Sequence, residues 1–356
     1  MKHPPYDRLL RSIGNTPLQG IELEIDGRWR EVWLKLEGVN PGGSIKDRTG
    51  RALMTALERD GRLDPDSIVV ESTSGNLGVA LAMICQARGT PFVAVVDPTI
   101  SDEKLDKLLQ YGAGVEMVDR PGASGGYLLS RLERVREMCA SSARYVWTDQ
   151  YSSPANPAAH FGTTGPEIHR QLGGRLDALF VSVSTGGTLA GIAGYVRRTV
   201  PHVRIVAVDA RGSQALGHVP GQRLLTGMGS GRASEFVTRT LYDRTHIASD
   251  AKAFALCREL RSELGISVGG SGGAAITACA AYLHAHPQAG PAVCVCPDTG
   301  ENYHSSIFDD GWLTKHGVWL SKADLAPVTA LRAGRTALPA AVDAAWDPTN
   351  GGWLYE

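Results

Sequence analysis

The sequence predicts an α/β fold, a mostly parallel sheet flanked by helices, and two observations lead to this prediction. Short apolar, β-branched runs recur five times along the chain, at 67–72, 91–97, 178–184, 203–209 and 292–298. Amphipathic stretches stand between several of them at the spacing of crossover helices. Strands that are apolar throughout and alternate with helices indicate a parallel sheet covered on both faces.

The elements follow one another in a regular order. Strand–helix pairs are expected at 67–72 with 76–89, 91–97 with 101–113, and 178–184 with 188–200. The run at 203–209 precedes a loop, and the run at 292–298 closes the series. The Pro-, Ser- and Asn-rich segment 150–162 is predicted to connect two domains, and 356 residues provide enough core for both.

Composition excludes several function classes. A hydrophobic content of 43% and a charged content of 21% are ordinary for a globular protein. The net charge of −1 argues against a nucleic-acid partner, which requires a basic surface. The sequence holds no apolar run of the roughly 18 residues that a membrane span requires, and its N-terminus does not resemble a signal peptide. We therefore expect neither nucleic acid nor membrane as a partner.

The cysteines indicate a reducing compartment and no metal site. They are Cys85, Cys139, Cys257, Cys279, Cys294 and Cys296. No two have CxxC spacing, and the last two alternate within an apolar run, as on one face of a buried strand. Because structural zinc requires about four ligands, core packing explains this pair better than metal binding. A cytoplasmic location is expected.

One glycine-rich loop has the context of a phosphate site. "STGGT" (184–188) directly follows an apolar strand and directly precedes a helix. Successive N–H groups at a helix N-terminus bind anions, and glycines allow a close approach; the alternative is a tight turn without a ligand. "GMGSGR" (227–232) has neither the spacing nor the context of a dinucleotide fingerprint.

Two further loops open helices. "ESTSGNLG" (71–78) offers Thr73, Ser74, Gly75 and Asn76 at a helix start, a set that suits a carboxylate beside an oxygen in need of an Asn donor. The alternative is a helix cap alone. "VGGSGGAA" (268–275) frames Ser271 with glycines, and by itself it favours a capped helix start.

Lys46 stands in "NPGGSIKDR" (40–48), after a Pro-Gly-Gly-Ser turn and before a helical run. It is a candidate surface charge, phosphate ligand or nucleophile. It does not fit a P-loop, because that motif requires Ser or Thr after the lysine, whereas Asp47 follows here, and no suitable glycine lies upstream.

Taken together and in order, these motifs resemble the cysteine-synthase-like pyridoxal-phosphate enzymes of fold type II. The similarity runs from "IGNTPL" (13–18) to "PDTGENY" (297–303), over most of the chain. It implies pyridoxal 5'-phosphate as cofactor, amino-acid substrates and a homodimer. It also implies a larger cofactor-binding domain at 1–39 plus 156–325, a smaller substrate-binding domain at 40–155, and a tail at 326–356 that holds Trp346 and Trp353.

The resemblance assigns roles to the motif residues. Lys46 resembles the lysine that carries the cofactor as a Schiff base and then acts as the base at Cα. Asn76 resembles the residue that bonds the ring hydroxyl of the cofactor, and Ser271 the one that faces its pyridine nitrogen. Thr73, Ser74 and Gly75 match the loop that binds the substrate carboxylate. The phosphate-binding residues are expected to be Ser184, Thr185, Gly186, Gly187 and Thr188.

A serine at the pyridine nitrogen implies that the cofactor ring withdraws electrons only moderately. Its hydroxyl donates to the unprotonated nitrogen, whereas a carboxylate would hold a proton there. The resemblance therefore implies Cα proton removal by Lys46, loss of a leaving group from Cβ, and addition of a nucleophile at Cβ.

Some stretches depart from the sulfhydrylase pattern. Leu77 replaces a hydroxyl residue after the asparagine, Ser184 replaces the usual glycine at the start of the phosphate loop, and 95–105 and 125–132 also differ. They resemble the branch that makes N-(2-amino-2-carboxyethyl)-L-glutamate, a precursor of 2,3-diaminopropionate in siderophores and peptide antibiotics. That branch joins O-phosphoserine and L-glutamate with loss of phosphate.

Glutamate brings two carboxylates, which require cations or hydroxyls. Arg131 is the leading candidate, with Tyr151 and Ser184 as polar partners; the alternatives are a solvated helix face and simple packing. For the leaving phosphate four residues remain open, and they are Arg211, His218, Arg223 and Arg232. His160 and His169 have no acid at a telling spacing, so surface or core positions are expected.

Two other functions stay open at the level of sequence. One is an O-phosphoserine or O-acetylserine sulfhydrylase. The other is a catalytically silent relative that binds ligands as a sensor or scaffold, against which the joint presence of Lys46, Asn76 and Ser271 speaks.

Overall fold

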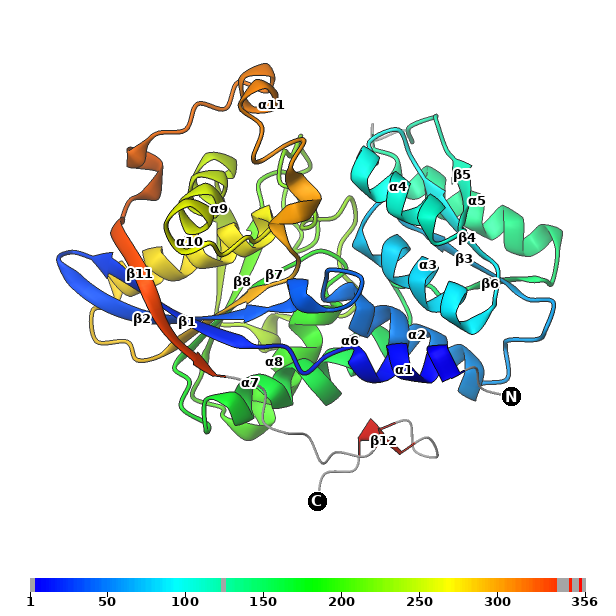
Figure 1. The fold of residues 1–356 in the computed structure, drawn as a ribbon, viewed down its shortest axis with the longest axis horizontal. Coiled ribbons are helices and arrows are strands. Elements are labelled where there is room, and N and C mark those ends of the chain that lie inside the picture. Colours follow the sequence, from blue (N-terminus) through cyan, green and yellow to red (C-terminus); the bar gives the residue numbers. More distant parts are fainter. Residues whose placement is uncertain (1–3, 123–125, 338–345, 348–351, 354–356) are drawn as a thin grey trace. The chain divides into compact units, whose positions relative to one another are not determined.

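The structure is a computed structural model that describes residues 4–122, 126–337, 346–347 and 352–353. Two compact units are present (Figure 1). The first unit is formed by the described parts of 1–14, 40–159 and 343–356, and the second by 15–39 and the described part of 160–342. Within the described residues no helix combines the length and the apolar character that a membrane span needs.

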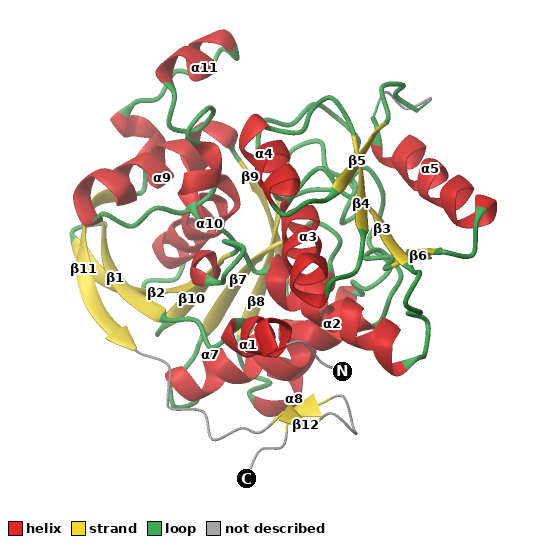
Figure 2. Cartoon of the chain, turned by 45° about the vertical axis from the view of Figure 1, so that its right-hand side comes forward, coloured by secondary structure: helices red, strands yellow, loops and turns green. Residues whose placement is uncertain are grey.

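The first unit is a parallel sheet with helices on both faces. Its described strands have the order β5-β4-β3-β6. They are β3 (Ile68–Ser72), β4 (Phe92–Val96), β5 (Gly114–Met117) and β6 (Tyr145–Trp147). Figure 2 shows α5 (Leu128–Ser141) on one face and α3 (Asn76–Arg88) on the other. Alternation explains the two faces: Val69 packs with α3, and its neighbour Val70 packs with Val135 of α5.

The second unit is built on a larger mixed sheet. The described strands have the order β11-β1-β2-β10-β7-β8-β9. They are β1 (Leu18–Ile25), β2 (Arg28–Leu36), β7 (Ala178–Ser182), β8 (Arg204–Ala210), β9 (Arg244–Ala248), β10 (Ala292–Cys296) and β11 (Val328–Ala337). Five neighbouring strands are parallel, and they are β2, β10, β7, β8 and β9. Strand β1 is antiparallel to both of its neighbours.

Helices cover both faces of this sheet. In Figure 1, α9 (Asp250–Leu264) and α10 (Gly270–Ala285) lie on one face, and α7 (Gly165–Gln171) and α8 (Gly187–Thr199) lie on the other. The core under α9 and α10 joins Phe254 and Ile276 to strand residues such as Phe180. The α/β fold with parallel sheets flanked by helices is therefore confirmed.

All five predicted strands are present, as β3, β4, β7, β8 and β10. β1 escaped prediction because polar residues occupy its half-buried side: it reads "LQGIELEI", and half-buried residues alternate with buried ones along it. Only Val328 is buried in the edge strand β11, which mixes Thr and Arg with small residues, so hydrophobicity gives little signal there.

The structure divides the chain differently from the expected domains at both ends. Helix α1 (Pro4–Ser12) belongs to the first unit, because Tyr6 and Leu9 join the core that contains α3. The described start of the tail belongs to the second unit, because β11 pairs with β1, as Figure 1 shows. Trp346 and Trp353 lie opposite each other in the pair β12 (Trp346–Asp347) and β13 (Gly352–Trp353), and the rest of the tail after 337 lies outside the described residues.

The remaining described elements connect these layers. They are α2 (Lys46–Arg59), α4 (Asp102–Gln110), α6 (Ala155–Ala159), α11 (Asp310–Lys315), the π-helical turn η2 (His160–Thr164), and the 3-10 turns η1 (Glu37–Val39), η3 (Arg239–Leu241), η4 (Gly300–Tyr303) and η5 (Lys322–Leu325).

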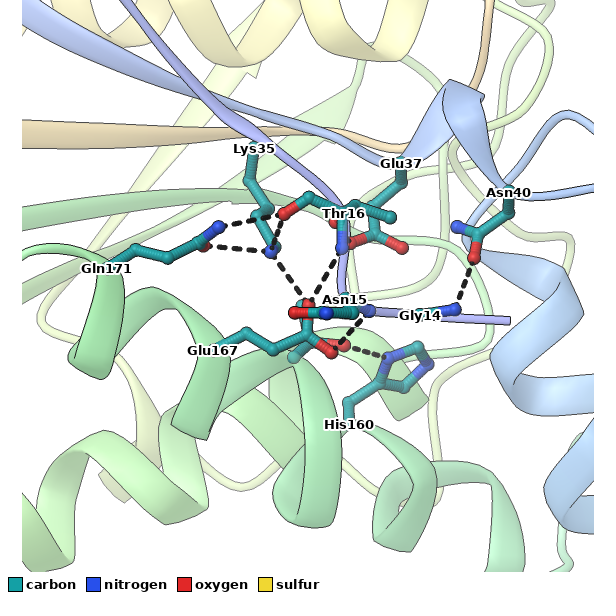
Figure 3. Close-up of polar contacts among 10 residues, drawn as sticks. Gly14, Asn15, Thr16, Lys35, Glu37, Asn40, His160, Glu167 and Gln171 are labelled. Atoms are coloured by element: carbon teal, nitrogen blue, oxygen red, sulfur yellow. Dashed lines mark hydrogen bonds and ion pairs between the residues drawn. The ribbon is translucent and has the colours of Figure 1, made fainter. Parts of the chain in front are cut away.

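A buried ion pair joins the start of the large sheet to α7 (Figure 3). Lys35 of β2 is fully buried, and its Nζ lies 2.7 Å from Glu167 Oε2. The same ammonium donates to Thr16 O at 2.7 Å and to Gln171 Oε1 at 2.9 Å. Buried charges are tolerated when they are paired and their hydrogen bonds are satisfied, so this cluster is structural.

Candidate active site

The expected site residues fall into two groups, one in each unit. Lys46, the 73–76 loop, Arg131 and Tyr151 belong to the first unit, and the 184–188 loop and Ser271 belong to the second.

Lys46 is the first residue of α2, and the turn before it is fixed by its own hydrogen bonds. Gly42 N donates to Asp47 Oδ2 at 2.6 Å, and Lys46 N donates to Ser44 Oγ at 3.2 Å. A Cβ atom on Gly42 would lie 2.5 Å from Asp47 Oδ1, and Gly43 has a φ of 85°. Both glycines are therefore required by the turn, which holds the backbone of Lys46 in one place.

The Lys46 amine is easier to deprotonate than an ordinary lysine. Burial lowers the pKa of Lys46 from 10.5 to about 8, and the negative charge of Glu71 opposes this shift. A pKa near 8 leaves a substantial fraction of neutral amine near neutral pH, and the neutral amine is the form that attacks a carbonyl carbon.

Glu71 lies at the end of β3, directly before the 73–76 loop, and is fully buried. Its Oε2 accepts from Thr148 Oγ1 at 2.5 Å and from Gln150 N at 3.0 Å. Its Oε1 accepts from Trp147 Nε1 at 3.2 Å and from Ser72 N at 2.8 Å. Burial raises the pKa of Glu71 to about 7, against the opposing effect of these hydrogen bonds.

The Glu71 network also holds the turn that carries Tyr151. Gln150 is buried, and its Nε2 donates to Ser72 O at 3.1 Å. Asn156 Nδ2 donates to Gln150 O at 2.7 Å. Tyr151, half-buried, follows directly. Because the turn is bonded to the end of β3, the structure holds the backbone of Tyr151 beside the strand that leads into the 73–76 loop.

The 73–76 loop opens α3 as expected, but its hydroxyls are partly committed. Thr73 Oγ1 accepts from Gly78 N at 3.1 Å, so it caps the helix. Ser74 Oγ donates to Asp97 Oδ2 at 2.8 Å. The loop backbone and Asn76 stand at the start of α3, where first-turn N–H groups have no partner within the helix. A carboxylate is the ligand that such a helix start favours.

Arg131 of α5 lies against this loop and not on a solvated helix face. Its side chain is 12% exposed, and its Nε lies 3.1 Å from Oδ2 of the buried Asp97. Its Nη1 donates to Ser74 Oγ at 2.9 Å. The structure thus brings Arg131 together with the predicted substrate loop, and Asp97 fixes the orientation of the guanidinium.

The 184–188 loop joins β7 to α8 in the second unit. Gly186 has a φ of 94° and caps α8, and a Cβ atom there would collide with Ser234 Oγ. Ser234 Oγ donates to Thr185 O at 2.7 Å, and Ser184 Oγ donates to Gly229 O at 3.1 Å. The loop is thus held by the 229–234 segment, and it stands at a helix N-terminus, a position whose N–H groups favour anions.

Ser271 is the second residue of α10 and is fully buried. Among the described residues its Oγ has no hydrogen-bond partner. Ser182 Oγ donates to Ser271 O at 2.6 Å, which fixes the start of α10 against the end of β7, two residues before Ser184. A buried hydroxyl without a partner is uncommon in folded proteins and suits a ligand acceptor such as a pyridine nitrogen.

These residues fit pyridoxal phosphate. In the second unit, a helix start suits the phosphate, and the buried hydroxyl of Ser271 suits the ring nitrogen. In the first unit, Lys46 has an amine of lowered pKa for the aldehyde. No group of three or more metal-binding side chains occurs among the described residues.

The four cationic candidates for the leaving phosphate differ in their exposure and contacts. Arg211 and His218 are exposed. Arg232 forms an ion pair with Glu235. Arg223 is half-buried, and its Nη1 donates to Ser230 O at 2.9 Å, next to the Gly229 carbonyl that Ser184 binds. Arg223 therefore contacts the 229–234 segment that holds the 184–188 loop, and Arg232 lies within that segment and is paired with Glu235.

Sequence reasoning missed Glu71 and Asp97. Both had a readable signal, since each is an acid at the carboxyl end of an apolar strand. His160 was expected to fill a surface or core position, and it is fully buried, with its Nε2 3.4 Å from Thr188 Oγ1. His169 contacts Tyr195 OH at 3.0 Å and has no described contact with the site residues.

Comparison with known proteins agrees with this chemistry. Residues 9–298 match the protein family described as "Pyridoxal-phosphate dependent enzyme". The chain is 45% identical over 303 residues to an N-(2-amino-2-carboxyethyl)-L-glutamate synthase of Ralstonia nicotianae, which covers 85% of this chain and 90% of that protein. It is 40% identical over 339 residues to a protein of the same name from Cupriavidus metallidurans, with coverage of 94% and 98%.

A solved structure is similar as well. The hydrogen sulfide-producing enzyme of Fusobacterium nucleatum superposes with a TM-score of 0.77 at 32% identity, over 83% of this chain and 98% of that one. The family match covers most of the sequence, and its range includes Lys46, the 73–76 and 184–188 loops and Ser271. The chain belongs to the family of pyridoxal-phosphate-dependent enzymes.

Proposed function

We propose that this enzyme replaces the phosphate of O-phospho-L-serine with the amino group of L-glutamate, giving N-(2-amino-2-carboxyethyl)-L-glutamate and phosphate. The observation that carries the proposal is the Arg131 guanidinium, held beside Ser74 by Asp97. The names of the two relatives above support it. Such a product suits a route to 2,3-diaminopropionate for a siderophore or a peptide antibiotic.

The residues divide the chemistry among them. Bound pyridoxal phosphate supplies the aldehyde and the electron-withdrawing ring. The 73–76 loop binds the carboxylate of phosphoserine, and the Lys46 amine removes its Cα proton. The Cβ–O bond then breaks, and the Cβ–N bond to glutamate forms as the amino group of glutamate loses a proton. Lys46 returns the proton to Cα.

The proposed cofactor contacts rest on the resemblance to the family and on the chemistry of each side chain. Asn76 bonds the ring hydroxyl, Ser271 donates to the ring nitrogen, and the 184–188 loop binds the phosphate. We assign Arg223 to the phosphate of phosphoserine, because it contacts the segment that holds that loop, whereas Arg232 is paired with Glu235.

Arg131 provides charge for a carboxylate of glutamate, with Tyr151 and Ser184 as polar partners. Asp97 Oδ2 lies 3.1 Å from Nε, and Ser74 Oγ accepts from Nη1. A guanidinium held in place by two such contacts binds a planar carboxylate at little further entropic cost.

A sulfhydrylase is the second candidate, favoured by the similarity to the hydrogen sulfide-producing enzyme. Two parallel assays distinguish the candidates. The holoenzyme is incubated with O-phosphoserine and either L-glutamate or sulfide, and products are identified by mass spectrometry. We expect the glutamate adduct and stoichiometric phosphate. Ready cysteine formation without any glutamate adduct would instead assign the enzyme to the sulfhydrylases.

The same preparation tests for a catalytically silent protein. A holoenzyme coloured by its bound cofactor that releases phosphate from O-phosphoserine excludes the silent alternative. A protein that stays colourless with added pyridoxal phosphate would support it.

We further propose that the enzyme works as a homodimer in the cytoplasm. All six cysteines are described as free thiols, and five of them are buried, which suits a reducing compartment. Light scattering on the purified holoenzyme measures the mass, and a monomer at micromolar concentration would contradict the dimer.

A further inference from the structure

His160 is a fully buried histidine whose two ring nitrogens both face threonine hydroxyls. It begins η2, which Figure 3 shows on the same helical stretch as Glu167. Its Nδ1 lies 3.1 Å from Thr164 Oγ1, and its Nε2 lies 3.4 Å from Thr188 Oγ1. Thr164 is buried too. The ring therefore links η2 to the first turn of α8, where the cofactor phosphate is expected.

The protonation of the imidazole decides what Thr188 can offer an anion. A neutral ring has one donor and one acceptor nitrogen. If the proton is on Nδ1, the ring donates to Thr164 Oγ1, and Nε2 accepts the hydroxyl proton of Thr188. The Thr188 hydroxyl can then act toward a ligand only as a hydrogen-bond acceptor. If the proton is on Nε2, the ring donates to Thr188 Oγ1, and the Thr188 hydroxyl is free to donate.

A phosphate at the start of α8 selects the second arrangement, because its oxygens only accept. The chain of donors is then Thr164 hydroxyl to His160 Nδ1, His160 Nε2–H to Thr188 Oγ1, and Thr188 hydroxyl to phosphate. Successive bonds in one direction polarise and strengthen one another. A π-helical turn is an uncommon feature that often accompanies functional sites, and here it holds the ring behind Thr188.

We propose that His160 is a positioning residue for the cofactor phosphate: it holds the Thr188 hydroxyl as a donor at the N-terminus of α8. The role concerns cofactor affinity. It rests on the 184–188 loop as the phosphate site and is independent of the second substrate.

The test is titration of the apoenzyme with pyridoxal phosphate, followed by absorbance. Thr188→Val removes the hydroxyl while keeping the shape of the side chain. In His160→Asn the side-chain amide reaches only the position of Nδ1. In His160→Gln the amide reaches the position of Nε2 and keeps a donor there. We expect Thr188→Val and His160→Asn each to weaken binding about tenfold or more, as for a lost charge-assisted bond. His160→Gln should stay within about threefold of the parent enzyme.

The double variant separates this role from general packing. If His160 acts through Thr188, then His160→Asn adds no further loss to Thr188→Val. The ³¹P resonance of the bound phosphate should shift alike in both single variants and stay parental in His160→Gln. Additive losses, parental affinity in either Thr188→Val or His160→Asn, or equal losses for Asn and Gln would each overturn the proposal.

Thr164→Val keeps the test open if His160→Asn does not fold. It leaves the ring in place and removes the donor to Nδ1, so cofactor binding should weaken about threefold. Parental binding in Thr164→Val, beside an unfolded His160→Asn, would assign His160 to the core alone.

Discussion

Ser182 Oγ donates a 2.6 Å hydrogen bond to the carbonyl oxygen of Ser271. Both serines are buried, yet their hydroxyls differ in kind: that of Ser182 is bonded within the protein, whereas that of Ser271 has no partner among the described residues. The first connects a strand end to a helix start. The second is a candidate ligand contact.

Substitution of each serine by alanine should affect the stability of the apoenzyme differently. Ser182→Ala removes a buried hydrogen bond and should lower the free energy of unfolding by about 1 kcal/mol. Ser271→Ala removes no bond in the apoenzyme, so stability should stay within about 0.5 kcal/mol, while affinity for pyridoxal phosphate falls. Urea unfolding and cofactor titration measure both. A Ser271→Ala apoenzyme destabilised as much as Ser182→Ala would refute the ligand assignment.

The lowered pKa of Lys46 predicts the pH dependence of cofactor attachment. Burial favours the neutral amine, so the pKa of about 8 lies below the ordinary 10.5. Below pH 8 the neutral fraction falls about tenfold per pH unit, and above pH 8 it levels off. Attachment of the cofactor to apoenzyme, followed by absorbance, should show this break. Lys46→Ala should show neither covalent attachment nor turnover, and product formation at parental rate in that variant would remove Lys46 from its catalytic role.

Glu71→Gln tests the buried carboxylate beside Lys46. Three of the donors that Glu71 accepts from are N–H groups. These N–H groups are spread over both oxygens, so the amide of Gln places its own NH₂ against at least one of them. Loss of a buried hydrogen bond with an unsatisfied group should cost about 1–3 kcal/mol in unfolding experiments.

The same substitution should move the Lys46 titration. The negative charge of Glu71 raises the pKa of Lys46. Removing it should shift the break in cofactor attachment to a pH below 8. Glu116→Gln, at a half-exposed pair with Arg134, is the matched control and should change neither property. An unmoved break in Glu71→Gln would show that the two groups do not interact.

Arg131→Ala should impair the use of glutamate more than the reaction of phosphoserine. The KM for glutamate should rise about tenfold or more, since a charge-assisted bond is lost, while phosphate release without glutamate falls less. Arg131→Lys should restore little, because one ammonium cannot match the Asp97, Ser74 and carboxylate contacts of a guanidinium. Arg134→Ala, one helical turn along α5, serves as the control. Equal loss in both half-reactions would reassign Arg131 to the first substrate.

The sequence determined five of the strands and the positions of the glycine-rich loops. Uniformly apolar runs indicate buried parallel strands, and glycine loops at strand–helix junctions indicate candidate anion sites, because both signals are local. That is why β3, β4, β7, β8 and β10 were predicted with the loops that follow β3 and β7. The turn before Lys46 follows the same rule, since Gly43 has a φ of 85°.

The tertiary structure decided which side chains serve one another. Arg131, Asp97 and Ser74 are separated by tens of residues and meet only because α5 packs on the sheet formed by β3 and β4. Glu71 and Gln150 meet because β3 and β6 are neighbours, and His160 reaches Thr188 only where η2 adjoins α8. Pairings of this kind depend on long-range packing, which leaves no pattern in the local sequence. The sequence thus indicates which groups can react, and the fold decides which partners and charge states they have.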